Sequence, residues 1–208
     1  MRTASGRKVL KALMDNRVFV IGRDTVPGAV SLKAGESLRW TFVVTSACKL
    51  DLTVDIQGEG CDVDIAALYV CGGSDRADFK VEVRHNSGGS VSRQLFKGIV
   101  SGSAKVSFDG LIYVAPDAQR TKAYQENHTI LLSEGARVET RPQLEIYADD
   151  VECSHGATTG YLSAEELFYM RSRGISEKDA RRLQIISFLS PILERLDGTL
   201  RGQILEKI

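Results

Sequence analysis

The sequence lacks the features that mark several large classes of protein. Its 27 lysine and arginine residues are balanced by 27 aspartate and glutamate residues, so no net charge draws the chain to nucleic acid or to an anionic membrane. No apolar run approaches the roughly 18 residues that a membrane span needs. The N-terminus is basic but has no continuous apolar core, so it is not a secretory signal. These absences predict a cytoplasmic protein that binds neither nucleic acid nor membrane.

The motifs of several enzyme classes are missing as well. The chain has no Gly-rich phosphate loop or Walker motif, so ATP binding by that route is not expected. It has no G-x-S-x-G nucleophile elbow. Its four cysteines form no C-x-x-C pair, and Cys48, Cys61 and Cys71 lie in strand-like segments where a cysteine is usually a small buried hydrophobe. We therefore expect reduced thiols at these three positions.

What the sequence does contain, from about residue 35 to 152, is a series of short strands. Apolar and polar residues alternate in residues 50–56, 63–69, 79–83 and 106–114, and Gly, Ser, Asn or Asp bounds each run. No long amphipathic helix interrupts the series, which excludes a βαβ fold. Alternation alone does not separate a sandwich from a solenoid. Three successive segments of similar shape, LIYVAPDAQ, ILLSEGARV and LEIYADDVE, favour stacked rungs.

The two ends of the chain are expected to be helical. Val9, Leu10, Leu13 and Met14 would share one face of a short N-terminal helix. We divide the chain into an N-terminal segment (1–30), a β core (31–160) and a C-terminal helical region (161–208).

Within that C-terminal region, Ser163 opens a capping box, and Gly174 is suited to the left-handed position after a helix. Ser176 caps a second helix, which Pro191 should kink or restart. A last short helix is expected through Leu200 and Ile204.

The stretch from 141 to 174 joins the β region to the α region and carries the main candidate site. Cys153 and His155 form a C-x-H pair, and alternate residues of an extended segment point to the same side. A thiolate and an imidazole are reasonable ligands for iron or an iron–sulfur cluster. The spacing by itself is a weak signal and favours a structural turn over a pair of ligands. The nearby Gly156 and Gly160 would permit close backbone approach or positive φ.

A resemblance adds to this reading. The run LEIYADDVECSHGATTG, followed by LFYMRSRGIS, resembles the C-terminal signature of the SufB/SufD family, scaffold proteins of the SUF pathway of iron–sulfur cluster assembly. The similarity extends upstream through RHNSGGSVSRQLFKGIVSGSAKVSFDGLIYVAPDAQ and covers roughly residues 80 to 195. It implies a mainly β fold, a right-handed parallel β-helix with a small C-terminal α-helical region. Family members are usually much longer, with an N-terminal region that this chain mostly lacks.

The resemblance also implies roles for individual residues. The SufD branch carries a cysteine and a histidine at Cys153 and His155, where they would ligate a transient iron–sulfur cluster shared with a partner subunit. The SufB branch has a cysteine in the segment matching TKAYQENHTILLSEG, and this chain has none there; Asn127 is near that place. The chain therefore resembles SufD more than SufB. The same similarity makes His128 a stronger candidate for a functional residue. Both His128 and His85 are nevertheless expected to be ordinary surface or core histidines.

Two partners follow from the resemblance. A second SufB/SufD-type subunit, giving a homodimer or a heterodimer, would pair with an edge of the β-helix. The SufC-type ATPase would dock on the C-terminal helices. There an apolar face, made of Leu167, Phe168 and Met170, lies beside the basic residues Arg171 and Arg173. The alternative is a carbohydrate- or small-molecule-active β-helix enzyme with paired carboxylates. Asp149 and Asp150 are adjacent, so they would face opposite ways in a strand, and we expect no enzyme activity.

Overall fold

The structure of the protein is a computed structural model that describes residues 14–208. Of the expected N-terminal helical face, Val9, Leu10 and Leu13 lie outside the described residues. Met14 is the first residue of a β-strand, so the predicted helix does not extend to that position.

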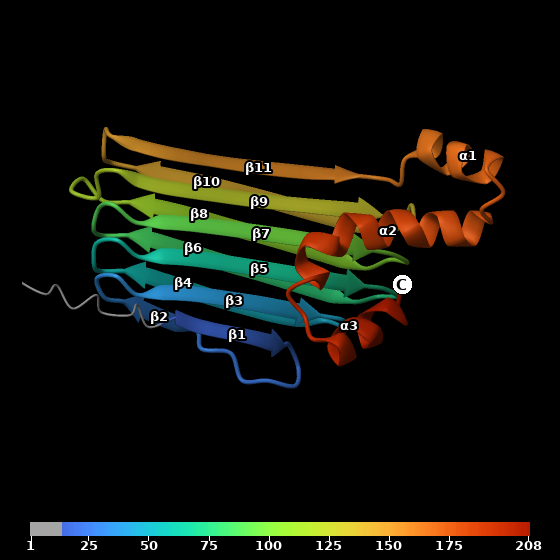
Figure 1. The fold of residues 1–208 in the computed structure, drawn as a ribbon, viewed down its shortest axis with the longest axis horizontal. Helices are drawn as coiled ribbons and strands as arrows, with labels where there is room; N and C mark the ends of the chain where they lie inside the picture. Colours follow the sequence, from blue (N-terminus) through green and yellow to red (C-terminus); the bar gives the residue numbers. More distant parts are fainter. Residues whose placement is uncertain (1–13) are drawn as a thin grey trace, which may run out of the picture.

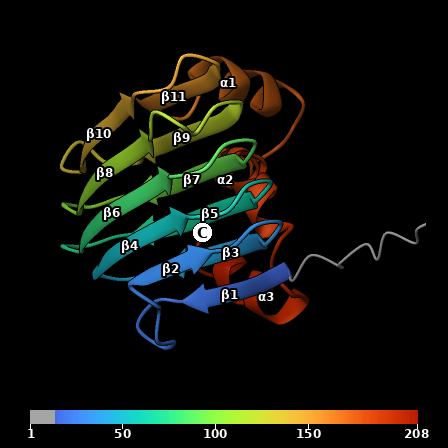
Figure 2. The ribbon, with the colours of Figure 1, turned by 90° about the vertical axis from the view of Figure 1, so that its left-hand side faces the viewer.

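Within residues 14–208, eleven strands are followed by three helices. The strands are β1 (Met14–Val20), β2 (Ala29–Leu32), β3 (Ser37–Val44), β4 (Cys48–Ile56), β5 (Asp62–Cys71), β6 (Arg76–His85), β7 (Val91–Val100), β8 (Lys105–Val114), β9 (Thr121–Leu131), β10 (Arg137–Ile146) and β11 (Val151–Gly160). They divide into two parallel sheets, β1-β3-β5-β7-β9-β11 and β10-β8-β6-β4-β2. Each strand pairs with the strand two places later, so the chain coils through both sheets (Figures 1 and 2). The prediction of a parallel β-helix is confirmed.

Stacked apolar rows hold the rungs together. The register places Leu50 beside Phe79 and Phe79 beside Phe108, all three facing the interior between the sheets. Phe96 reaches across from the other sheet, with its ring centroid 4.7 Å from that of Phe108. Each strand alone buries one apolar row, and stacking makes those rows a continuous core. The alternation seen in residues 50–56, 63–69, 79–83 and 106–114 corresponds to this interior.

The strands begin earlier than the sequence indicated. In β1, Asp15 and Arg17 pair in register with the inward-facing Leu38 and Trp40. Charged residues therefore occupy inward positions in the first described rung, and the apolar alternation is broken there. The Trp40 indole donates a hydrogen bond to the Asp15 carboxylate at 3.2 Å, and the Arg17 guanidinium donates to Asp15 at 2.6 Å. These polar contacts explain why periodicity did not identify β1.

Three helices follow the last strand: α1 (Ala164–Ser172), α2 (Glu177–Leu193) and α3 (Gly198–Leu205). Ser163 and Ser176 are the N-caps of α1 and α2, as predicted, and Gly174 has φ of 85° just after α1. Helix α2 packs across the outer face of the β1–β11 sheet (Figure 1). Its buried residues and their sheet partners form a second core: Val43, Ala66, Leu68, Ile99, Ile185, Leu189, Ile192 and Leu193.

Pro191 does not restart α2, because the helix continues to Leu193. A proline has no N–H, so the carbonyl four residues earlier, that of Ser187, loses its helical donor. The Ser190 hydroxyl donates to that carbonyl at 2.9 Å instead. The local sequence thus satisfies the acceptor that Pro191 leaves free. None of the helices within residues 14–208 is long and apolar enough to cross a membrane.

Candidate functional site

The last rung of the β-helix, β10 with β11, is open to solvent along its edges. Strand β11 pairs with β9, and β10 pairs with β8. No strand in the described part of the chain pairs with the outer edge of either. Their outward-pointing backbone N–H and C=O groups are therefore available to another chain. Figure 1 shows β11 at the end of the stack, with α1 extending beyond it.

Cys153 and His155 lie on this rung and share one side of β11. Cys153 is in register with Ala123 of β9, and His155 is in register with Gln125. Ala123 and Gln125 are both buried in the interior. Because paired residues of a parallel sheet point the same way, both candidate ligands stand over the interior at the open end. A thiol and an imidazole, two residues apart, therefore lie above the buried side chains of Ala123 and Gln125.

The two groups differ in their surroundings. Cys153 is half-buried and packs against the small cluster of Ile112, Val114 and Ala123. This burial raises the pKa of the Cys153 thiol, and the Glu152 carboxylate adds to the effect, although a backbone hydrogen bond from Ala123 acts against it. The thiol is therefore protonated at neutral pH in the free chain, and a metal must displace that proton to bind. His155 is exposed.

The glycines next to the pair do not play the part expected from the sequence. Gly156 and Gly160 belong to β11 and have no positive φ. A Cβ built on either would meet nothing within 4 Å. The prediction of a left-handed backbone or a close approach within the chain is wrong, because the segment continues as an extended edge strand.

His128 faces away from Cys153 and His155. Its register partner in β11 is Thr158, on the outer face of the sheet. Its Nδ1 lies 2.7 Å from the Thr158 hydroxyl, and its Nε2 lies 3.2 Å from a Glu126 carboxylate oxygen. The structure therefore brings Cys153 and His155 together and leaves His128 on the opposite side of the sheet.

The interior beneath the rung contains several buried polar side chains. Asn127 is buried and accepts a hydrogen bond from the Tyr69 hydroxyl at 3.1 Å. His85 is also buried, with its Nε2 2.8 Å from the Ser92 hydroxyl. Burial lowers the pKa of His85 to about 4, so this ring is neutral at physiological pH.

The expected partner surface on α1 is largely exposed. No residue of α1 is buried, and Phe168 is 75% exposed. Leu167 and Met170 are half-buried, while Arg171 and Arg173 are exposed. The Arg171 guanidinium lies 3.6 Å from a Glu177 carboxylate oxygen. An exposed aromatic side chain beside cations is typical of a protein-binding surface.

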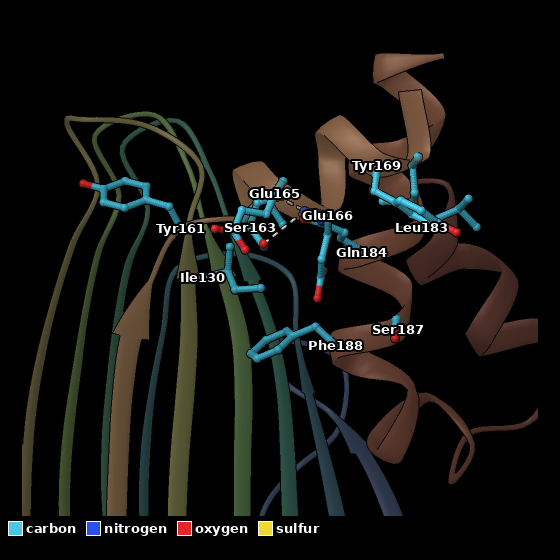
Figure 3. A pocket seen from close by; sticks show the side chains of 12 residues that line it. Ile130, Tyr161, Ser163, Glu165, Glu166, Tyr169, Leu183, Gln184, Ser187 and Phe188 are labelled. Carbon is cyan, nitrogen blue, oxygen red and sulfur yellow. Dashed lines mark hydrogen bonds between the residues drawn. The ribbon is translucent and has the colours of Figure 1, made fainter. Parts of the chain in front are cut away.

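A groove of about 780 Å³ lies beside this surface, between α1, α2 and the end of β9 (Figure 3). Its lining is mostly apolar and comes from Ile130, Tyr161, Leu162, Ser163, Glu165, Glu166, Tyr169, Met170, Leu183, Gln184, Ser187 and Phe188. Of these, Met170 alone was singled out from the sequence as a partner-binding residue. Leu183 lies three residues before Ile186 on α2, at helical spacing, yet it is 48% exposed in this groove. Helical periodicity predicts which side of a helix is apolar, but it does not predict which residues at the border of that side stay exposed.

Asp149 and Asp150 are exposed in the turn between β10 and β11. Within residues 14–208, no group of three or more His, Cys, Asp or Glu side chains is placed to hold a metal ion. The described part of the chain thus presents Cys153 and His155 at the open end as a pair.

These features define a class of protein: a parallel β-helix whose open end carries a thiol and an imidazole, followed by an exposed helical appendage. Comparison with known proteins agrees. The family model described as "SUF system FeS cluster assembly, SufBD core domain" matches residues 29–188. The chain belongs to the SufB/SufD family, as its motifs predicted.

Individual relatives are similar over most of this chain. The iron–sulfur cluster assembly protein SufD of Escherichia coli (strain K12) is 41% identical over 157 residues, which cover 75% of this chain and 37% of that protein. The SufBD family protein slr0076 of Synechocystis sp. is 38% identical over 179 residues, covering 84% and 40%. SufD of Bacillus subtilis (strain 168) is 33% identical over 144 residues, covering 69% and 33%. The chain thus spans well under half the length of these relatives, which are named as assembly proteins.

Proposed function

We propose that this chain is a non-enzymatic scaffold and partner subunit of iron–sulfur cluster assembly, and that its last rung receives the nascent cluster as cargo. The observation that carries the proposal is the placement of Cys153 and His155 on one side of β11, at an unpaired strand edge. A ligand pair at such an edge is accessible to a second chain, which would supply the remaining ligands. Membership of the SUF family supports iron–sulfur chemistry at this position.

The chemistry of the pair suits transient binding. A thiolate and a neutral imidazole both bind iron. Burial raises the pKa of the Cys153 thiol, so ligation competes with a proton and requires its release. His155 is exposed and can reach a cluster on the partner's side without rearrangement of the core. Two ligands from one chain leave the cluster incompletely coordinated, which favours its later transfer.

The partner over the rung would be a second SufB/SufD-type subunit. Strand β11 has ten residues, Val151–Gly160, with a free backbone edge. Addition of a strand there would satisfy its N–H and C=O groups by main-chain hydrogen bonds. The same contact would cover Cys153 and His155 and place the partner's ligands opposite them. Either a second copy of this chain or a related subunit fits this description.

The helical region would dock the SufC-type ATPase. The chain has no phosphate-binding loop of its own, so the ATPase would supply any work from ATP hydrolysis. The exposed Phe168, the half-buried Leu167 and Met170, and the exposed Arg171 and Arg173 form the proposed contact. The proposal places the complex in the cytoplasm, where the four cysteines, free in the structure, remain reduced.

Anaerobic co-purification tests this function. The tagged chain is isolated from its own cells without oxygen, and the bound proteins, iron and sulfide are identified. We expect an ATPase and a SufB/SufD-type chain, with iron and sulfide in the complex. A chain that is recovered alone, or with partners but with no iron or sulfide under any assembly condition, would contradict the proposal.

A further inference from the structure

A column of polar side chains leads from the interior of the β-helix to His155. The register places Gln94 of β7 beside Gln125 of β9, and Gln125 beside His155 of β11. One rung further in, the position is apolar, because Gln94 pairs with Ile65. Both glutamines are almost completely buried. The polar column is therefore confined to the two rungs directly beneath the candidate ligand.

The amide of Gln125 is held in one place. Its Nε2 donates to the Gln94 Oε1 at 3.0 Å. The facing sheet makes room for it at Gly110, where a Cβ would lie 2.5 Å from the Gln125 Oε1 and 2.6 Å from its Nε2. Any larger residue at Gly110 would displace the amide. The two contacts leave one atom of the Gln125 amide without a partner.

That atom is the carbonyl oxygen of Gln125, which is buried and accepts no hydrogen bond within the described chain. A buried acceptor without a donor is destabilising, because it has given up its hydrogen bonds to water. A neutral imidazole that ligates a metal through one nitrogen carries a proton on the other, and that N–H needs an acceptor. In the free chain His155 is exposed, so water can serve. Once a second chain covers the rung, the acceptor must come from protein.

We propose that Gln125 is the positioning residue of His155: its side-chain carbonyl accepts the hydrogen bond of the non-ligating ring nitrogen. This proposal rests on the ligand role of His155 given above. The Gln125 Nε2 donates to Gln94, which leaves the Gln125 carbonyl free to accept, and Gly110 provides the space. The result is a single ring tautomer, with the opposite nitrogen directed out of the β-helix toward the cargo. A donor at the same place would instead block ligation.

The test uses the assembled complex, with the chain labelled with ¹⁵N-histidine and Zn²⁺ as a diamagnetic probe. The wild-type complex should show one His155 tautomer with a slowly exchanging ring N–H. Gln125→Met removes the acceptor at similar volume, and should speed exchange of that proton at least about tenfold and weaken Zn²⁺ binding about 10- to 100-fold. Gln125→Glu keeps an acceptor and should restore slow exchange. Thr129→Val, which removes a buried hydroxyl that stacks beneath Thr159 rather than His155, is the matched control and should change neither readout.

The outcomes separate this proposal from the one it rests on. Loss of Zn²⁺ binding in Cys153→Ser and His155→Ala, with unchanged tautomer, exchange and affinity in Gln125→Met, would overturn the role of Gln125 alone. Zn²⁺ binding that survives both ligand substitutions would overturn the ligand role and the Gln125 role together. Equal losses in Gln125→Met and Thr129→Val would show a general effect on the fold and also contradict the positioning role.

Discussion

Replacing Phe168 by alanine should weaken docking of the ATPase strongly while changing the stability of the free chain little. Phe168 lies on α1, a helix with no buried residue, and is itself 75% exposed. It therefore contributes little to the cores formed by the strands and α2. If it is a docking residue, its exposed surface becomes buried only when the partner binds.

The exposed fraction sets the two magnitudes. A phenylalanine side chain buries about 200 Å² when fully covered. One quarter of that area, at about 25 cal/mol per Å², gives an upper limit of about 1.2 kcal/mol for the folding loss. The remaining three quarters correspond to about 4 kcal/mol in the complex, and each 1.4 kcal/mol is about a tenfold change in Kd. We expect a Kd at least about 30-fold higher and a fall in Tm of no more than about 4 °C.

The assay is titration of the chain with the purified ATPase by calorimetry, together with thermal melts of each variant. Tyr147→Ala is the matched control, because Tyr147 is also an exposed aromatic residue, at 60%, but follows β10 rather than lying on α1. It should leave ATPase binding unchanged. Unchanged affinity of Phe168→Ala, or a loss of stability comparable to that of a core substitution, would refute the assignment of this face.

Two further predictions concern the interior. Burial holds the pKa of His85 at about 4, below its unfolded value near 6.5, so the unfolded chain binds the proton more readily. The free energy of unfolding should therefore fall as the pH drops from about 6.5 to 4, by about 2 kcal/mol at pH 5. Urea unfolding of His85→Gln should lack that component, and identical pH profiles would disprove it. Gly98→Ala would place a Cβ 1.8 Å from the buried Tyr69 ring and should lower the free energy of unfolding by at least about 2 kcal/mol. Gly156→Ala, where a Cβ would meet nothing within 4 Å, should leave the free energy of unfolding unchanged in the same urea experiment.

Much of the fold follows from local patterns, because each rung repeats the same physical problem. The alternating rows around Leu50, Phe79 and Phe108 had to face an interior, and they stack there. The sequence also predicted the helix N-caps at Ser163 and Ser176, because a side-chain oxygen just before a helix accepts a hydrogen bond from a free backbone N–H. Alternation did not choose between a sandwich and a solenoid, because that choice depends on which strands pair.

Other features depend on contacts between distant residues, and local patterns do not encode them. Strand β1 carries Asp15 on its inward face, where the indole of Trp40, 25 residues away, donates to its carboxylate. The column beneath His155 joins Gln94 and Gln125, which are 31 residues apart. In the sequence these glutamines are ordinary polar residues of a strand. Their significance appears only when the register of the rungs is known.

The central claim is that Cys153 and His155 hold cargo at the open end of the β-helix, and cluster yield tests it most directly. The complex is reconstituted anaerobically with wild-type chain, Cys153→Ser or His155→Ala, and iron and sulfide are quantified beside thermal melts of each isolated chain. Both side chains lie on an edge strand and His155 is exposed, so little core volume is lost and the melts should be nearly unchanged. Each variant should form markedly less cluster. Full cluster yield from both variants would contradict the claim and leave this segment as an edge strand with a structural role.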